Sequence, residues 1–244
     1  MEDPVFDGWL AALEARHMAD LRVQEVTRAL RALSTAYVER RTHVALDSAG
    51  KRAAFALFYA PLHFLTVRLI VRSLDAHREA PRTIVDLGCG TGAAGAAWAI
   101  DSSPQSRVVG VDRHPWAVDE ARWTYRQLKV DGDARRGDIT KMPRRLRGAA
   151  FLAAYALNEL RPEDREQLLT QMTASEDRLL VIEPISRAVT PWWNDAAAEV
   201  LKAGGRADEW RFDVELPPLL AKLDKAAGLN HRELTARTLY CPGR

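Results

Sequence analysis

The sequence contains only two cysteines, Cys89 and Cys241, among its 244 residues. Two isolated cysteines do not supply the clustered spacing of a zinc site, nor a framework of several disulfides. We therefore expect no metal in this chain. A reducing, cytoplasmic compartment is the expected location for a chain with so few candidates for a disulfide.

The sequence also lacks a basic amino-terminal segment and a long uncharged apolar run. Residues 2–7 include three acidic side chains where a secretion signal would be basic. The most apolar stretch, Ala53–Val71, contains His63 and Arg68 and is interrupted by Pro61. A membrane span needs about 20 residues with few or no charges. We expect a buried core helix here and no membrane partner.

A strong charge imbalance is missing as well. The formal net charge is +2, which is too small to indicate a nucleic-acid-binding protein unless the basic residues cluster. Apolar residues make up 47% and charged residues 28%, a composition typical of globular domains.

The first 80 residues are predicted to be helical. Apolar residues recur there at spacings of three and four, which places them on one helix face: Val23, Val26, Leu30, Leu33 and Tyr37. A second helix is predicted over residues 52–74, with a kink or offset at Pro61. We expect residues 1–80 to form an amino-terminal helical annex.

From residue 81 onward, short β-branched runs alternate with helical segments. Strands are predicted over residues 83–87, 107–112, a segment ending near 138, 149–155, 178–183, 210–216 and 233–241. Helices are predicted over residues 93–100, 116–128, 162–173 and 218–227. This alternation predicts an α/β fold in residues 81–244, a doubly wound, mostly parallel seven-stranded Rossmann-like sheet whose two late strands form an antiparallel addition.

Glycines follow the first predicted strand directly, at Gly88, Gly90 and Gly92. Glycines between a strand and a helix let the backbone approach a ligand near the positive end of the helix dipole. The spacing fits a dinucleotide loop or a loop for S-adenosylmethionine (SAM). Asp86 favours SAM, because a carboxylate at this position would repel a pyrophosphate but attract the α-ammonium of a methionine.

Three segments resemble the cofactor motifs of class I methyltransferases: Val85–Gly92, Val109–Asp112 and Gly137–Ile139. The resemblance implies SAM as cofactor, with Asp112 on the ribose hydroxyls, Asp138 at the adenine amino group and Ile139 over the ring. Asp112 lies 24 residues after Gly88, near the offset expected of a ribose-binding acid. The alternative for Asp112 and Asp138 is a capping or turn role.

The predicted cofactor site contains ten residues: Asp86, Gly88, Cys89, Gly90, Gly92, Asp112, Arg113, Asp138, Ile139 and Tyr155. In this set Arg113 would lie alongside the adenosine, or simply on the loop surface. Cys89 is interpreted as a small residue that fills the loop and not as a nucleophile. Tyr155 would pack against the cofactor.

The methyl acceptor is expected at the end of the fourth strand, beside Asn158 and Glu159. These two residues are the predicted catalytic groups. For Asn158 the alternative is a cap on the following helix. The Asn-Pro-Pro-Tyr signature of many amino-group methyltransferases is absent, which weakens the case for base amine methylation.

A second resemblance joins the segments Ala36–Arg41, Tyr155–Leu160 and Leu180–Pro184. Together they are similar to the methyltransferase-like assembly factors of the small ribosomal subunit. That family commonly carries a cysteine cluster for iron–sulfur ligation, whereas this chain has one cysteine outside the glycine loop. We therefore expect no iron–sulfur centre.

Six basic residues form a strip that would bind RNA phosphates: Arg135, Arg136, Lys141, Arg144, Arg145 and Arg147. The alternative is a solvated basic loop. Trp192 and Trp193 would line an acceptor pocket or serve packing. We predict a SAM-dependent methyltransferase with ribosomal RNA as the first candidate acceptor. The alternatives are a small-molecule methyltransferase and a non-catalytic, SAM-binding ribosome assembly factor.

Overall fold

The computed structural model describes residues 3–38, 46–78, 80–141, 148–174 and 177–243. The helical elements are α1 (Pro4–His17), α2 (Val23–Val38), α3 (Ala49–Ala54), η2 (Phe55–Tyr59), α4 (Ala60–Ser73), α5 (Ala93–Asp101), α6 (Pro115–Gln127), η3 (Ile139–Lys141), η4 (Leu157–Glu159), α7 (Pro162–Thr173), α8 (Trp193–Lys202) and α9 (Pro218–Ala227). The strands are β1 (Thr83–Leu87), β2 (Arg107–Asp112), β3 (Gly132–Arg136), β4 (Ala149–Ala154), β5 (Arg178–Glu183), β6 (Arg206–Asp213) and β7 (Glu233–Cys241).

The chain folds into two compact units that do not follow the boundary expected after residue 80. The helical unit comprises Met1–His63 and Phe212–Leu234, and the sheet unit comprises Phe64–Arg211 and Thr235–Arg244. Helix α9 therefore belongs with the amino-terminal helices, although the sequence places it between two strands of the sheet. Most of α4 belongs to the sheet unit.

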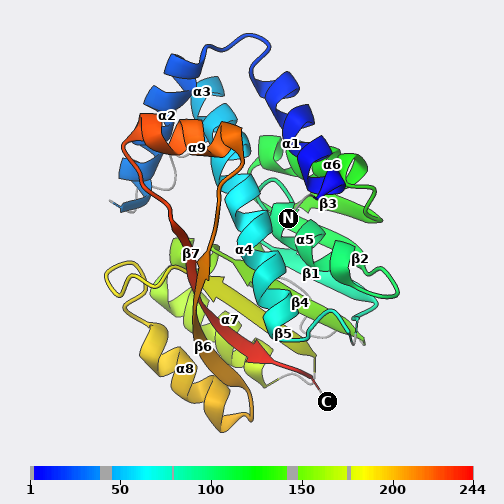
Figure 1. The fold of residues 1–244 in the computed structure, drawn as a ribbon. Helices are drawn as coiled ribbons and strands as arrows, with labels where there is room; N and C mark the ends of the chain where they lie inside the picture. The colour runs from blue at the N-terminus through cyan, green and yellow to red at the C-terminus, as the bar shows by residue number, and fades with distance from the viewer. Residues whose placement is uncertain (1–2, 39–45, 79, 142–147, 175–176, 244) are drawn as a thin grey trace. The chain divides into compact units, whose positions relative to one another are not determined.

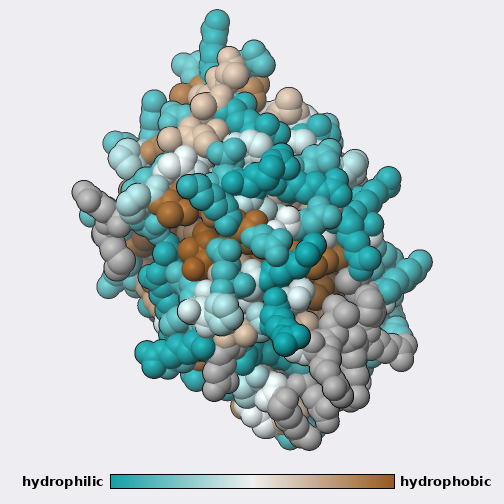
Figure 2. Space-filling view, turned by 90° about the vertical axis from the view of Figure 1, so that its right-hand side faces the viewer, coloured by the Kyte–Doolittle hydropathy of each residue, from teal (hydrophilic) through white to brown (hydrophobic). Residues whose placement is uncertain are grey.

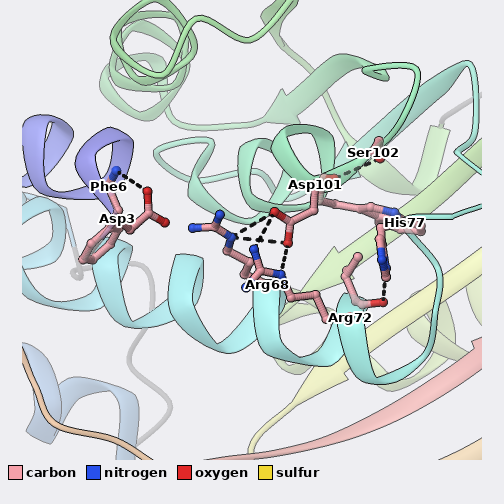
Figure 3. Close-up of polar contacts among 9 residues, drawn as sticks. Asp3, Phe6, Arg68, Arg72, His77, Asp101 and Ser102 are labelled. Atoms are coloured by element: carbon pink, nitrogen blue, oxygen red, sulfur yellow. Dashed lines mark hydrogen bonds and ion pairs between the residues drawn. The ribbon is translucent and has the colours of Figure 1, made fainter. Parts of the chain in front are cut away.

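In the helical unit, α2 packs against α3 and α9. The predicted apolar face of α2 is confirmed at its centre, because Val26, Leu30 and Leu33 are completely buried. In α1, the Asp3 carboxylate accepts a hydrogen bond from Phe6 N and so caps the first turn (Figure 3).

Helices α3, η2 and α4 form one continuous helical stretch, Ala49–Ser73, in which Phe55–Tyr59 is a π-helical turn. Pro61 follows this turn and cannot donate the usual backbone hydrogen bond. A π turn is one of the established ways in which a helix accommodates such a disruption. The stretch is long and apolar enough to cross a membrane, but 67% of its most apolar window is buried in the protein, the burial expected of a core helix.

The sheet unit contains a seven-stranded sheet in the order β3-β2-β1-β4-β5-β7-β6 (Figure 1). Strands β1 to β5 pair in parallel, and β7 pairs antiparallel with β5. The predicted doubly wound, mostly parallel sheet with a late antiparallel addition is confirmed. The order reverses at β1 and β4, which is the switch point where open α/β sheets bind ligands.

Helices cover both faces of this sheet. Helices α7 and α8 bury Leu169, Met172 and Trp193 against one face, and α5 and α6 pack against β1, β2 and β3 on the other. Hydrophilic residues cover most of the surface drawn in Figure 2, with smaller hydrophobic patches between them.

Helix α4 is joined to α5 by a partly buried ion-pair network (Figure 3). Arg68 Nε lies 3.0 Å from Asp101 Oδ1, and Arg72 Nη2 donates to the same oxygen over 2.9 Å. The Asp101 side chain is only 8% exposed, so both guanidinium groups depend on a carboxylate that is shielded from water.

We predict that Asp101→Ala lowers the free energy of unfolding by about 2–3 kcal/mol, because it leaves two arginines without their shared carboxylate. Urea denaturation of both proteins measures this difference. Glu199→Ala is the control, since the Glu199–Lys202 pair is largely exposed and is worth about 0–1 kcal/mol. Equal effects of the two substitutions would contradict the prediction.

Candidate functional site

The predicted site residues follow strands that end at one edge of the sheet. Strand β1 leads into Gly88, β2 ends at Asp112, β4 leads into Tyr155, and β5 ends at Glu183. Because these strands are parallel, their carboxyl ends meet at the same edge. The structure therefore brings the predicted cofactor and acceptor residues together.

The glycine loop is held against β2 by its own backbone. Gly88 N and Cys89 N both donate to Val111 O, over 2.8 and 3.1 Å. Gly88 has a φ of +70°, and a Cβ at this position would lie 2.6 Å from the Cβ of Ala156. Only glycine fits here without displacing the segment that follows β4.

Helix α5 begins at Ala93, and its N-cap residue is Gly92, whose φ is +78° and which offers no side chain as a cap. Gly95 N in the first turn donates to the Asp86 carboxylate, whereas the N–H groups that open an uncapped helix can bind a ligand or water. A helix start of this kind, after a glycine loop, suits the polar groups of the predicted cofactor.

Asp86 lies beneath the loop and is 1% exposed. Its Oδ2 accepts from Gly95 N over 2.9 Å, which ties β1 to the first turn of α5. Its Oδ1 is buried and accepts no hydrogen bond from the described residues. Burial raises the pKa of Asp86 to about 7; the hydrogen bond from Gly95 opposes the shift and the Asp112 charge adds to it. The predicted attraction to an ammonium group stays a prediction.

Asp112 is half-buried and engages the loop directly. Its Oδ2 accepts from Gly90 N over 3.0 Å, and its Oδ1 accepts from His114 N over 2.8 Å. The alternative turn role is therefore present, and it fixes the carboxylate at the loop where a ribose is expected. Arg113 next to it is exposed.

Cys89 is buried, and desolvation raises the pKa of its thiol well above the usual value. A thiol that stays protonated is a poor nucleophile. Its Sγ lies where a Cβ on Gly110 would come within 2.8 Å, so the absence of a side chain at Gly110 makes room for it. These facts agree with the interpretation of Cys89 as a space-filling residue.

Asp138 forms a turn at the end of β3. Its Oδ1 accepts from Thr140 N and Thr140 Oγ1, over 3.0 and 2.8 Å, and the bond from the Thr140 side chain is the main cause of its lowered pKa. Gly137 N donates to Asp112 O, which keeps this turn beside the ribose-binding candidate. Ile139 is buried. The adenine contacts of Asp138 and Ile139 remain predictions.

Tyr155 has a left-handed backbone, with a φ of +58°. This conformation is rare for an aromatic residue and concentrates at functional sites. Its N–H donates to Ile182 O over 2.8 Å, and its hydroxyl is hydrogen-bonded to Thr66 of α4. Burial raises the pKa of the phenol. The turn at Tyr155 directs the chain toward the glycine loop at Ala156.

Asn158 and Glu159 lie in the short turn η4, and their side chains differ in environment. The Asn158 amide points to Glu183, whose Oε2 accepts from Asn158 Nδ2. Asn158 therefore does not cap α7, whose N-cap is Arg161. Glu159 is exposed. Partial desolvation by neighbouring atoms and the charge of Asp112 raise the pKa of its carboxyl group, and the charge of Arg113 lowers it. Solvent screens these effects at an exposed group.

Glu183 is a site residue that the sequence argument named only as part of a motif. It is completely buried at the end of β5, and its Oε1 accepts from Leu157 N over 3.0 Å. An acidic residue directly after the apolar run Leu179–Ile182 is the sequence signal for it.

The structure places the two tryptophans in packing contacts and describes three of the six residues of the basic strip. Trp193 is buried with Arg237 over its ring at 5.1 Å, and Arg165 lies 4.9 Å over Trp192, an arrangement that indicates packing. Arg135, Arg136 and Lys141 are exposed. Three further residues of the strip, and part of the Ala36–Arg41 motif, lie outside the described residues: Arg144, Arg145, Arg147, Glu39, Arg40 and Arg41.

Within the described part of the chain, no group of three or more His, Cys, Asp or Glu side chains is arranged to hold a metal ion.

Residues 84–175 match a family model described as a methyltransferase domain. Three solved structures share the fold. Mitomycin 7-O-methyltransferase MmcR is 17% identical, with a TM-score of 0.54 over 98% of this chain and 73% of that one. Magnesium protoporphyrin IX methyltransferase of Synechocystis PCC 6803, crystallised with SAM, is 15% identical, with a TM-score of 0.51 over 73% and 79%. A protein of Pyrococcus horikoshii described as an RNA methyltransferase is 14% identical, with a TM-score of 0.50 over 74% and 83%.

A search of curated proteins found no match. The family match shows a SAM-dependent methyltransferase domain over residues 84–175, and the shared fold confirms the predicted Rossmann-like architecture. They do not extend to the resemblance to ribosome assembly factors, which is not confirmed.

We predict that Asp112→Ala weakens SAM binding by about tenfold or more, because a charge-assisted hydrogen bond is worth about 1.5–3 kcal/mol. Isothermal titration calorimetry with SAM measures the change. Asp119→Ala, an exposed acid on the neighbouring helix α6, is the control and should bind like the wild type. An unchanged dissociation constant in folded Asp112→Ala would show that Asp112 does not bind the ribose.

SAM affinity should rise with pH. The positively charged sulfonium and ammonium groups favour ionised Asp86, whose pKa is about 7 in the free protein. Below that pKa, binding must displace a proton, so the dissociation constant should fall by about tenfold from pH 6 to pH 8. Asp86→Asn should flatten this dependence, and S-adenosylhomocysteine, which lacks the sulfonium charge, should show a weaker one. A steep dependence that persists in Asp86→Asn would exclude Asp86 as its source.

Proposed function

We propose that this chain, whose residues 84–175 form a SAM-dependent methyltransferase domain, methylates RNA at the carboxyl edge of its sheet. SAM supplies a methyl group activated by the adjacent sulfonium. The acceptor atom forms a bond to the methyl carbon as the carbon–sulfur bond breaks, which leaves S-adenosylhomocysteine. Asp86, Asp112 and the glycine loop would bind the cofactor, and the turn after β4 would face the acceptor.

The observation that carries the RNA proposal is the position of the basic residues relative to Asp112. Arg136 on β3 lies opposite Asp112 on β2 in the pairing of these two strands. The Nε of Arg136 donates to Arg113 O over 3.2 Å. Arg135 and Lys141 are exposed beside it. Strand β3 is the edge of the sheet, so these cations are accessible along one margin of the cofactor site. Exposed cations in a row are the electrostatic footprint of a phosphate backbone.

A small-molecule acceptor is the second candidate. The shared fold with mitomycin 7-O-methyltransferase covers 98% of this chain, so it includes the helical unit as well as the sheet unit. An enzyme for a compact acceptor would not need the exposed cations of β3.

Glu159 is the proposed acceptor-facing group. It is exposed, and it is close enough to Asp112 and Arg113 for their charges to influence its pKa. A carboxylate there would accept the proton that an N–H or O–H acceptor loses after methylation.

Incubation with SAM labelled on its methyl group tests the function. Label recovered in deproteinised ribosomal RNA supports the proposal. Label recovered only in small molecules from a cell extract favours the second candidate. SAM binding without transfer to either fraction would indicate a non-catalytic protein, such as an assembly factor.

We predict that the triple substitution Arg135→Ala, Arg136→Ala and Lys141→Ala weakens RNA binding at low salt. It should flatten the log–log dependence of RNA affinity on salt by about two to three units, nearly one for each lost phosphate contact. Fluorescence anisotropy with labelled RNA over a salt series gives this slope. SAM binding should be retained.

The matched control removes three exposed cations from α8 and β6, at the opposite edge of the sheet: Lys202, Arg206 and Arg211. This control should keep the wild-type salt slope. If both triple variants lose the same slope, the contacts are non-specific and β3 has no special role.

A further inference from the structure

The turn η4, Leu157–Glu159, connects β4 to α7 and has little internal hydrogen bonding to fix it. Glu159 N donates to Ala156 O and Leu160 N donates to Leu157 O, each over 3.2 Å. Ala156, just before the turn, lies against Gly88 of the cofactor loop. The turn is thus confined on one side by the loop and needs a second point of attachment.

Glu183 provides that attachment from the next strand. Its Oε1 accepts from Leu157 N over 3.0 Å, and its Oε2 accepts from Asn158 Nδ2. One carboxylate therefore holds the backbone of one turn residue and the side chain of the next. Register explains the contact, because Ala154 at the end of β4 pairs with Ile182, the residue before Glu183.

Burying the Glu183 carboxylate costs free energy of folding. The side chain is 0% exposed, and a carboxylate removed from water is destabilised unless donors compensate. Burial raises its pKa to about 8, while hydrogen bonds from the backbone of Leu157 and Asn158 oppose that shift. Among charged neighbours, Glu159 of η4 adds to the shift and Arg165 of α7 opposes it, and Arg237 is its register partner on β7. An apolar side chain at position 183 would suit the packing of β5 equally well. Packing therefore does not explain why this buried position is occupied by an acidic residue.

We propose that Glu183 is a positioning residue for methyl transfer, which fixes η4 against the cofactor loop and so places Glu159 at the acceptor. The inference rests on the proposed function, because it takes the acceptor to bind beside Glu159. Glu183 itself is buried and is not proposed to touch the acceptor or SAM.

The unpaired oxygen of Asn158 makes the proposal testable with a conservative variant. Asn158 Oδ1 is buried and accepts no hydrogen bond from the described residues. In Glu183→Gln, Oε1 of the glutamine accepts from Leu157 N. A half-turn of the Asn158 amide then lets its oxygen accept from the glutamine Nε2. Both attachments of the turn are thereby kept, whereas Glu183→Ala removes both.

Hydrogen–deuterium exchange of the Leu157 amide tests the positioning without any turnover. In Glu183→Ala this amide should exchange about ten- to a hundredfold faster than in the wild type, because its buried acceptor is lost. In Glu183→Gln it should remain protected. Glu120→Ala, which removes a different buried acid of the sheet unit, should leave Leu157 protected. Unchanged exchange in Glu183→Ala, in protein that melts cooperatively, would overturn the proposal.

Transfer kinetics test the consequence, with methyl-labelled SAM and ribosomal RNA as the substrates. Glu183→Ala should lower kcat by about ten- to a hundredfold with SAM affinity retained, and Glu183→Gln should recover most of that loss. In the Asn158→Ala background, Glu183→Ala should have a smaller effect than it has alone, since one of its two attachments is already gone. Equal losses in the alanine and glutamine variants would contradict a positioning role. If the wild type transfers no methyl group to RNA, the proposed function fails, and the exchange measurement still decides whether Glu183 holds the turn.

Discussion

The two hydrogen bonds from Gly88 N and Cys89 N to Val111 O join the end of β1 to the end of β2, and the rest of the site is built around this junction. The path of the loop requires a positive φ at Gly88 and leaves no room for a side chain there. With the loop in this position, Gly90 N reaches Asp112 and Gly95 N reaches Asp86. The acceptor side is set by the same constraint, because Ala156 occupies the space that a Cβ on Gly88 would take.

Several carboxyl groups gather around the glycine loop. Besides burial, the Asp112 charge raises the pKa of Asp86 and of Glu159, and the Glu159 charge raises the pKa of Glu183. Gathering carboxyl groups in a partly buried place favours a positively charged ligand and opposes a pyrophosphate. SAM carries positive charge on its sulfonium and ammonium groups. The charge pattern therefore supports, independently of any motif, the choice of SAM over a dinucleotide.

Most of the order of strands and helices in the sheet unit could be predicted from the sequence, because β-branched runs alternate there with helical periodicity. The strand predicted over residues 210–216 lies at Arg206–Asp213 instead. Helix α7 and strand β7 were predicted at the bounds that the structure gives them. The grouping of α9 with the amino-terminal helices could not be predicted, because it depends on tertiary packing with α2 and η2. Helix α8, which was not predicted, begins at the two tryptophans, and aromatic residues are no strong signal of a helix start.

The residues of the candidate site also differ in how well the sequence predicts them. Asp112 and the loop glycines could be located from local spacing, since the strand, the loop and the helix are consecutive in the chain. The contact between Asn158 and Glu183 joins residues 25 positions apart. It depends on the register of β4 and β5, which no local pattern specifies. The sequence therefore placed Asn158 just after β4 and could not show that its amide donates to Glu183.

Asp86 and Glu183 contribute least to the stability of the free protein at neutral to alkaline pH. Asp86 and Glu183 have folded-state pKa values of about 7 and 8, well above those of the same groups in an unfolded chain. The stability that their neutral forms contribute is complete below the unfolded values and is lost as pH rises through the folded ones. A cation bound beside Asp86 would offset part of this loss, because it would favour the ionised form of that carboxyl group.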